Sequence, residues 1–522
     1  MVRSVGVPAD REAVPRHGGR SLALAVLCTV LFLTFLDNTV VSVALGQLYG
    51  SLHASPTQLQ WVVGAYALTF ASLMLACGMI GDELGRKKVM LAGAGVFCVG
   101  SVVCALAPTV QVLIAGRAVM GMGAAASEPG TLSMLRHLYP GAKARSRAIG
   151  IWAATSGFAL AAGPLIGGVL IGVWNWRGIF WFNLAFGLAA LVVAAVILPE
   201  SADPTAARVD TAGTLLGAGT LAALVFAIID SESAGFGAAE VIALLCVSAV
   251  LFVAFVWRER RAEHPLLDLR FLRVPQFTTS NIVAFCTYFA TFAVFFFTAL
   301  YLVIVVGLSG YKLALVFLPM TVLMIVASVL AGRWTAIVGP RWSIAIGCVL
   351  MAVGLFLAQG YISPHPSYGP LIVALALTGI GIGTTVVPIT SSVLSAVPAE
   401  RSGMAASAAN TSREIGAVTG VAILGSLMFS QLYTSLTTQM NHLHVPAVYR
   451  GFVFAAIETG NFSVPSHLSA ELENLLHELT DVAYSAFHNG LRAALWLSAG
   501  LTLLAALLAL ITLRSQRVDV GS

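Results

Sequence analysis

Three ionisable residues, Asp37, Arg117 and Glu128, lie inside long apolar segments of this 522-residue sequence. Charged side chains inside a membrane are costly, and they normally pair with one another or face water. Asp37 and Arg117 each lie about seven or eight residues, or roughly 12 Å along a helix, from the predicted outer end of their segments. We therefore expect them to approach each other in the outer half of a central cavity. Such a carboxylate can couple proton binding to conformation as its Arg partner approaches or withdraws, and a purely structural ion pair is the alternative.

Glu128 follows Arg117 on nearly the same helical face, roughly three turns nearer the predicted inner side. A second carboxylate at this depth could bind protons or a cationic substrate, or its side chain could extend towards the inner surface. Another acid–base pair, Arg413-Glu414, precedes the thirteenth apolar segment. We interpret that pair as interfacial and structural.

The composition excludes a soluble fold. Hydrophobic residues make up 58% of the chain and charged residues only 10%, with a mean hydropathy of +0.91. Soluble domains carry roughly 25% charged residues. The net charge of +5 gives no indication of a nucleic-acid partner. All seven cysteines fall inside apolar runs, so no disulfide framework, metal site or redox role is expected.

Fourteen apolar segments are long enough to cross a bilayer, which takes about 20 residues. The sequence therefore predicts an all-α membrane protein in a six, two, six arrangement. The predicted spans are 22–45, 59–79, 89–107, 110–134, 148–170, 179–198, 212–229, 241–257, 282–306, 313–330, 342–359, 371–397, 416–433 and 491–513.

Basic residues alternate between the two sides of these spans. With the N-terminus inside, the outward connections contain only four basic residues, Arg177, Lys312, Arg450 and Arg492, and most of the others lie in the inward connections. This is the positive-inside bias, so both termini are predicted to be cytoplasmic in a multi-pass protein of the cell (inner or plasma) membrane.

The predicted organisation has five parts. They are a cytoplasmic N-terminal segment (1–20), a six-helix bundle (21–198), a two-helix insert (199–262), a second six-helix bundle (263–513) and a cytoplasmic tail (514–522). The second bundle includes a long external loop (434–489). Within it, residues 469–479 have the pattern of an amphipathic surface helix, and an ordinary external loop is the alternative.

A glycine-bounded turn follows the second span, at Gly78-Met79-Ile80-Gly81-Asp82-Glu83-Leu84-Gly85-Arg86-Lys87-Lys88. Glycines permit a tight turn, Asp82 can cap the start of a helix, and the basic cluster can bind the inner membrane face. The segment closely resembles the signature loop of the major facilitator superfamily, which implies the two-bundle fold of that family. In the family, the acid and the basic residues (here Asp82, Arg86 and Lys87) help to hold the two bundles together. Gly332 and Gly339 repeat the spacing of Gly78 and Gly85 after the tenth span.

Further motifs resemble those of the fourteen-helix drug:proton antiporters (QacA/EmrB type). They are 36–45 in the first span, 117–125 in the fourth, and 157–168 in the fifth. The fifth-span motif contains Gly157, Gly163, Pro164, Gly167 and Gly168, and its counterpart in the family is largely confined to exporters. It has no ionisable group and cannot carry protons, but its small residues allow close packing and Pro164 allows a bend.

The resemblance implies a proton-coupled antiporter that exports lipophilic compounds, cations among them, by alternating access. The alternative is a dedicated exporter of one endogenous metabolite, lipid or siderophore. We expect no enzymatic activity and no cofactor, because the sequence has neither a nucleophile–base set nor a GxxxxGK[ST] phosphate loop. The expected partners are a small lipophilic substrate, protons and membrane lipid, without an obligate protein partner.

Overall fold

The computed structural model describes residues 17–201, 210–263, 265–362, 367–398, 401–443, 445 and 470–513. Every regular element within these ranges is helical. The elements are α1 (His17–Leu52), α2 (Pro56–Leu84), α3 (Arg86–Ala105), α4 (Val110–Leu138), α5 (Ala142–Val173), α6 (Arg177–Ile197), α7 (Thr211–Ala234), α8 (Ala239–Arg261), η1 (Phe271–Arg273), α9 (Pro275–Ala293), the π-helical η2 (Val294–Thr298), α10 (Ala299–Ile304), α11 (Gly310–Tyr361), α12 (Tyr368–Ser395), α13 (Ser402–His442) and α15 (Ala470–Thr512).

Twelve of the described helical stretches are each long and apolar enough to cross a membrane. Helix α5 is bent by 42° between its two halves, and the two halves taken together form one more such segment. Helix α11 has 52 residues, about 78 Å at 1.5 Å per residue, which is more than twice a hydrocarbon core of roughly 30 Å. Gly339 interrupts it with φ 83° and ψ 162°, so α11 contains two spans. With α11 counted as two, the described residues contain fourteen segments that are long and apolar enough to cross a membrane, the number that the sequence predicts.

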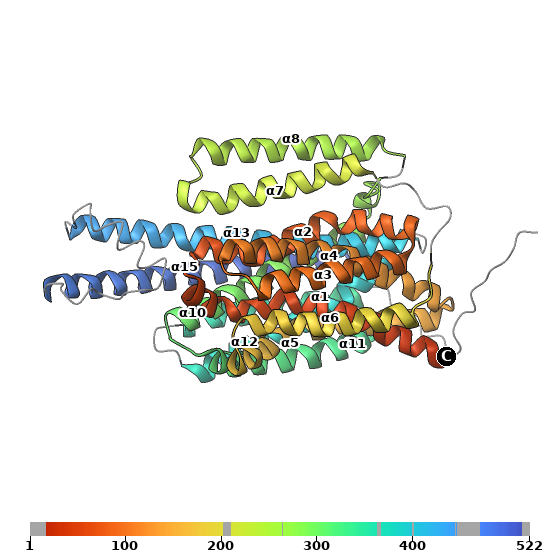
Figure 1. Ribbon diagram of the computed structural model, residues 1–522, viewed down its shortest axis with the longest axis horizontal. Coiled ribbons are helices and arrows are strands. Elements are labelled where there is room, and N and C mark those ends of the chain that lie inside the picture. Colours follow the sequence, from red (N-terminus) through yellow and green to blue (C-terminus); the bar gives the residue numbers. More distant parts are fainter. Residues whose placement is uncertain are drawn as a thin grey trace, which may run out of the picture.

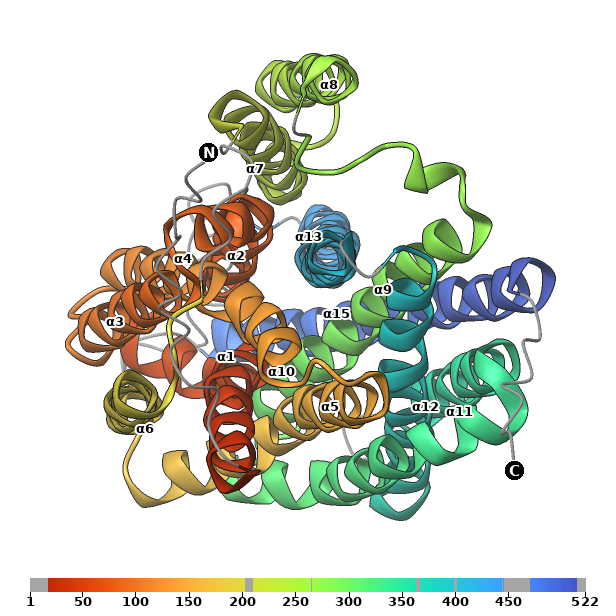
Figure 2. The same ribbon diagram turned by 90° about the vertical axis from the view of Figure 1, so that its right-hand side faces the viewer.

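The helices pack in sets that follow the sequence. In the first half of the chain, α1 packs on α5 and α6, and α4 packs on α2 and α3. In the second half, α9 and α15 pack on α13, and α11 packs on α12 and α15. Two seams join the halves, α2 against α13 and α5 against α11. The end-on view in Figure 2 shows these helices around a common axis.

The α7–α8 pair lies at one side of the other helices (Figures 1 and 2). Helix α7 contacts α2 and α13, and α8 packs mainly on α7. Only 11% of the apolar stretch of α8 is buried against the rest of the chain, so α8 faces lipid over most of its surface.

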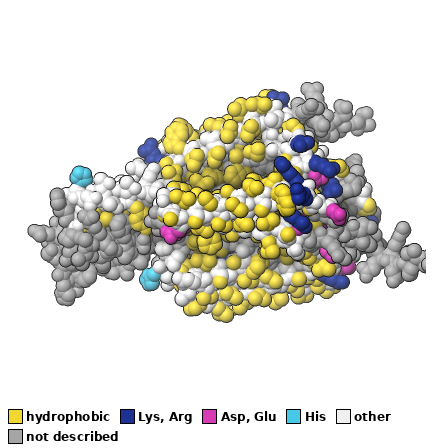
Figure 3. All heavy atoms as spheres, turned by 90° about the horizontal axis from the view of Figure 1, so that it is seen from above, with side chains coloured by type: hydrophobic (Ala, Val, Ile, Leu, Met, Phe, Trp, Pro, Cys, Tyr) yellow, Lys and Arg dark blue, Asp and Glu magenta, His cyan; other side chains and the backbone are white. Residues whose placement is uncertain are grey.

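The outer surface has the polarity of a membrane protein. Figure 3 shows apolar side chains covering the body of the molecule and most of the visible Lys and Arg towards one end. Large exposed hydrophobic residues such as Val196 (80% exposed) and Ile337 (79% exposed) would be unfavourable in water and are stabilised by hydrocarbon.

The structure corrects the prediction of a long loop over 434–489. Helix α13 continues to His442, and α15 begins at Ala470 and runs unbroken to Thr512. Both helices extend beyond the other spans (Figure 1), at the end opposite the basic cluster of Figure 3. Hydropathy detects where a helix leaves the bilayer but not where the helix itself ends, because the backbone hydrogen bonds continue in water. Residues 470–479 of the predicted surface helix form the first part of α15, whereas residues 444 and 446–469 lie outside the described residues.

Candidate functional site

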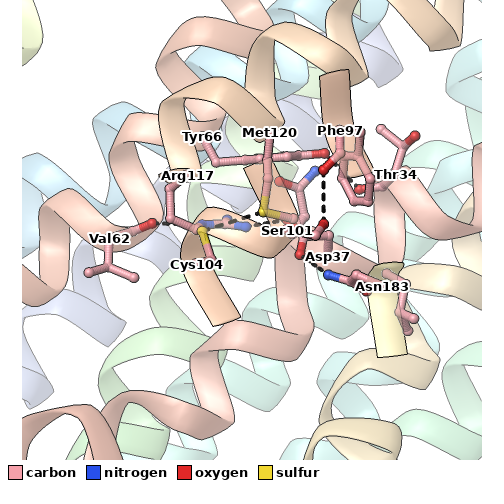
Figure 4. Close-up of polar contacts among 12 residues, drawn as sticks. Thr34, Asp37, Val62, Tyr66, Phe97, Ser101, Cys104, Arg117, Met120 and Asn183 are labelled. Atoms are coloured by element: carbon pink, nitrogen blue, oxygen red, sulfur yellow. Dashed lines mark hydrogen bonds and ion pairs between the residues drawn. The ribbon is translucent and has the colours of Figure 1, made fainter. Parts of the chain in front are cut away.

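Asp37 of α1 and Arg117 of α4 form a direct ion pair in the interior of the first six helices. Both side chains are fully buried, and the Arg117 Nη1 atom donates to Asp37 Oδ2 (Figure 4). The Arg117 Nε atom donates to the Val62 carbonyl at 2.9 Å, and its guanidinium lies 4.4 Å above the Tyr66 ring centre. The approach of these two charges agrees with the sequence prediction. Their role in proton coupling stays a prediction.

Asn183 of α6 completes the surroundings of Asp37. Its Nδ2 atom donates to Asp37 Oδ1 at 2.6 Å, so both carboxylate oxygens have donors from other helices (Figure 4). The ion pair and the amide together give both oxygens of this buried side chain a hydrogen-bond donor. Removing Arg117 or Asn183 would leave an oxygen of the Asp37 carboxylate without a donor in the low-dielectric interior.

Glu128 of α4 lies in the interior and does not extend to the inner surface. It is 1% exposed, and Asn410 of α13 donates its Nδ2 hydrogen to Glu128 Oε1. The surface-directed alternative is therefore wrong. The Glu128 Oε2 atom is buried and has no hydrogen-bond partner among the described residues, so one oxygen is free to accept from a ligand or water.

Arg413 and Glu414 are buried as well, so their interpretation as an interfacial pair is wrong. Both are 1% exposed, and α13 begins at Ser402, which puts Arg413 eleven residues, or about 16 Å, inside the helix. The sequence prediction began the span at Gly416 because it treated the charged pair as a helix end. The run of small residues from Ser402 to Asn410 was the signal that the helix starts earlier.

Arg413 organises the polar groups of the second half of the chain. Its Nη1 atom donates to Asn410 Oδ1 at 2.8 Å, and its Nη2 atom donates to Thr390 Oγ1 at 2.5 Å. The guanidinium lies 5.5 Å from the ring centre of Tyr288. Arg413 therefore fixes the orientation of the Asn410 amide, and this directs the amide NH₂ group towards Glu128.

Two carboxylate–amide hydrogen bonds connect the halves of the molecule. Asn38 of α1 donates to Glu414 Oε1 at 3.0 Å, and Asn410 of α13 donates to Glu128. Asn410 and Glu414 are four residues apart, on one face of α13. One turn of α13 therefore bonds to both α1 and α4. Its partner on α1, Asn38, directly follows Asp37 in the sequence.

The inner-turn motif connects α2 with α3 and lies close to α13. Asp82 Oδ1 accepts from Arg86 Nε at 2.7 Å, and Gly85 has φ 111°, a conformation that side chains disfavour. Gly78 faces α13, since a Cβ atom there would lie 3.5 Å from Ser407 Oγ. Lys87 is the second residue of α3, which begins at Arg86.

Asp82 does not cap a helix start, which corrects the sequence prediction. It lies within α2, and Gly85 is the N-cap of α3. Glu200 provides the missing acceptor instead, because its Oε1 atom accepts from the backbone N–H of Lys87 at 3.1 Å. The motif therefore contains the Asp82–Arg86 ion pair. A backbone N–H in the first turn of α3 donates to Glu200, which follows the end of α6.

The glycines of the fifth-span motif lie where α5 meets its neighbours most closely. A Cβ atom on Gly163 would lie 2.0 Å from Thr39 Oγ1 of α1, and one on Gly157 would lie 2.4 Å from Ser328 Oγ of α11. Gly167 approaches the Val40 carbonyl in the same way, at 2.9 Å, and Gly168 is buried in the following position. Pro164 lies inside α5, whose halves Arg147–Leu160 and Ala162–Val173 form the 42° bend just before it. The motif therefore allows α5 to lie against both halves of the molecule.

Comparisons with known proteins agree with this architecture. Residues 27–421 and 320–456 match the family model of the Major Facilitator Superfamily. The chain is 34% identical over 469 residues to the multidrug resistance protein Stp of Mycobacterium tuberculosis, covering 89% of this chain and 87% of Stp. It is 33% identical over 429 residues to the methylenomycin A resistance protein of Streptomyces coelicolor, covering 81% of this chain and 89% of that protein.

A similar fold is found in the crystal structure of a bacterial homologue of the human lysosomal transporter Spinster. The TM-score is 0.63 at 18% sequence identity, with 95% of this chain and 98% of that chain covered. Fourteen spans, the two interior seams, the inner turn and the family match together lead to one assignment. The chain is a multi-pass membrane transporter that belongs to the Major Facilitator Superfamily.

Proposed function

We propose that this transporter is a proton-coupled antiporter that exports lipophilic compounds, cations among them, by alternating access. Stp carries the name of a multidrug resistance protein, and an export function of this kind would account for the similarity. The fold supplies two helix sets with seams between them, which is the usual basis of alternating access. The single observation that carries the proton-coupling proposal is the buried Asp37–Arg117 ion pair.

Protonation of Asp37 would remove the negative charge to which Arg117 is paired. Arg117 retains the Val62 carbonyl and the face of Tyr66 as partners, so its guanidinium can remain buried while the ion pair weakens. Asn38 is the next residue on α1 and donates to Glu414 of the second half. A small shift of α1 on protonation is therefore transmitted directly to α13.

Glu128 would be the site where proton and cationic substrate compete. One of its oxygens is held by Asn410 and the other is free of protein partners among the described residues. A cation close to Oε2 would favour the ionised carboxylate, whereas a proton would neutralise it. Competition of this kind couples inward proton movement to outward movement of the substrate.

A dedicated exporter of one endogenous metabolite, lipid or siderophore is the second candidate. The similarity to the methylenomycin A resistance protein favours it, because that protein is named for a single antibiotic. The two candidates share the same coupling chemistry and differ only in the range of substrates.

The basic end of Figure 3 would face the cytoplasm, and both termini would then be cytoplasmic, as the positive-inside bias predicts. The plasma membrane would supply the proton gradient. This orientation puts the inner-turn motif inside and the projecting ends of α13 and α15 outside.

Everted membrane vesicles test the proposal. A panel of lipophilic cations and neutral compounds is added to energised vesicles while a fluorescent dye reports lumenal pH. Proton release on addition of several compounds, absent in Asp37→Asn at equal protein level, is the expected result. A response to one endogenous compound alone would favour the dedicated exporter, and transport without any proton movement would overturn the coupling mechanism.

A further inference from the structure

Ionisable side chains are buried where α1, α4 and α13 meet, and their charges do not balance. They are the acids Asp37, Glu128 and Glu414 and the bases Arg117 and Arg413. Asp37 and Arg117 form the ion pair described above, so their charges cancel. Within the described part of the chain, Arg413 is the one buried cation that interacts with the other two acids. With both of those acids ionised, two negative charges would face one positive charge.

Arg413 interacts with both carboxylates but forms an ion pair with neither. Its Nη1 atom donates to Asn410 Oδ1 at 2.8 Å and its Nη2 atom to Thr390 Oγ1 at 2.5 Å, and both acceptors are neutral. No ion pair joins it to an acid among the described residues. One positive charge is therefore divided between Glu128 and Glu414. An unbalanced charge is costly in a low-dielectric interior, so this place can accommodate a second positive charge.

The two carboxylates hold equivalent positions between the halves of the molecule. Glu128 of α4 accepts from the Asn410 amide of the second half. Glu414 of α13 accepts from the Asn38 amide of the first half. Asn410 and Glu414 are one helical turn apart, and the two carboxylates interact electrostatically. In both acids Oε2 has no hydrogen-bond partner among the described residues, so each retains one oxygen that can take a proton.

The remaining ionisable groups around this pair of acids supply no net charge. Tyr66 of α2 and Tyr288 of α9 both interact with the two carboxylates. A phenol is neutral at the pH of the cell, so neither ring provides the missing positive charge. The Asp37–Arg117 pair on α1 and α4 contributes one charge of each sign.

From this count of charges we propose that Glu128 and Glu414 form one exchange site, which takes either a proton or a cationic substrate as its second positive charge. The inference rests on the proposed export function and adds Glu414 to the residues that exchange protons. A cation that binds displaces the proton to water, so the total charge of the site is the same before and after the exchange. A cation is therefore exported for one more proton than a neutral compound, which leaves the proton on the pair.

The burial of the pair connects this exchange to the movement of the halves. Glu128 and Glu414 are each 1% exposed, and the amide partner of each comes from the opposite half. Protons and substrate therefore reach the pair only when the halves separate at one end. The site is then open to one side of the membrane at a time, as alternating access requires.

Calorimetric titration of the purified full-length protein with ethidium tests this proposal. Titrations in two buffers of different ionisation enthalpy give the number of protons released per cation bound. The wild-type protein should release about one proton per ethidium, and Glu414→Gln, which keeps an acceptor for Asn38, should release about none. Binding without release by the wild-type protein, or unchanged release by Glu414→Gln, would overturn the proposal.

Matched variants separate proton exchange from structural effects. Asn38→Ala removes the bond to Glu414 but keeps both carboxylates, so the proton should still be released. Asp37→Asn should also release it, because the proton comes from the pair. Glu240→Gln, at an exposed position of α8, serves as the charge-matched control. A loss of release in Asn38→Ala as large as that in Glu414→Gln would mean that Glu414 acts only through its bond to Asn38.

Infrared spectroscopy provides a readout that needs no ligand. In the cation-free protein at neutral pH, the protonated member of the pair contributes the C=O stretching band of a carboxylic acid. Because one proton serves both acids, Glu128→Gln and Glu414→Gln should each remove this band. A band that either variant leaves unchanged would contradict the shared proton.

Transport is measured separately in everted vesicles. If the wild-type protein releases the proton on binding ethidium but exports no compound, the export proposal fails and the exchange site stands. If it exports cations and neutral compounds for the same number of protons, the exchange site is refuted and the export proposal stands.

Discussion

Asn38 of α1 donates a hydrogen bond to Glu414 of α13 at 3.0 Å, across 376 positions of the sequence. Through this bond, the helix that carries Asp37 is connected to the helix that carries Arg413 and Asn410. The Asp37 site that we propose for proton coupling is therefore one residue away from a direct contact with the second half of the molecule.

A double-mutant cycle on Asn38 and Glu414 measures that contact. We expect Asn38→Ala and Glu414→Gln to be non-additive in thermal stability of the purified protein, with a coupling of about 0.5–3 kcal/mol, as for residues in direct contact. Asn38→Ala combined with Glu240→Gln, on the remote insert, serves as the additive control. Additivity in both cycles would mean that the bond contributes nothing to the folded state.

The Asp37–Arg117 pair should show the energetics of a buried ion pair. Asp37→Asn leaves Arg117 buried without its counter-charge, at a cost of about 3–5 kcal/mol, and a lower midpoint of thermal unfolding is expected. Asp37→Asn combined with Arg117→Met should regain much of that stability without regaining proton coupling. Recovery of coupling in the double variant would assign the pair a structural role alone.

Glu128 should discriminate substrates by charge. Glu128→Gln retains an acceptor for the Asn410 amide but removes the negative charge, so we expect export of lipophilic cations to fall about tenfold while neutral compounds are transported at near wild-type rates. The rates are compared in the same vesicle preparation, with Glu83→Gln at the exposed inner turn as the charge-matched control. Equal loss for neutral compounds would argue against direct charge recognition.

The close approach at Gly163 can be tested by adding one methyl group. Gly163→Ala would bring a Cβ atom 2.0 Å from Thr39 Oγ1, so α5 must shift against α1 and transport should fall severely. Thr39→Ala in the same chain removes the nearest atom and should restore part of the activity. Gly172→Ala on the same helix, where the nearest atom lies 3.9 Å away, should be silent. Normal transport by Gly163→Ala would show that this contact is not required.

The membrane fold was predictable from the sequence, and so was one part of the polar interior, the approach of Asp37 to Arg117. Long apolar segments and the distribution of Arg and Lys define the spans, and two lone opposite charges at equal depth, Asp37 and Arg117, have few other partners in hydrocarbon. The bend near Pro164 and the break at Gly339 follow from local backbone chemistry.

The rest of the polar core required the structure. Hydropathy treats Arg413 and Glu414 as the end of a span, because it cannot register partners such as Thr390 and Asn38 that come from distant helices. Glu200 was missed for the same reason, since its acceptor role at Lys87 depends on how α6 ends beside α3. A cavity under α7 and α8 likewise arises from packing between helices, which one-dimensional patterns do not contain.

The most direct test of proton-coupled export uses the purified protein in liposomes with an acidic lumen. The account predicts that a lipophilic cation accumulates inside in proportion to the pH difference, that protons leave the lumen as it does so, and that both movements stop in Asp37→Asn. Cation movement by wild-type protein that is unaffected when nigericin abolishes the pH difference would contradict it.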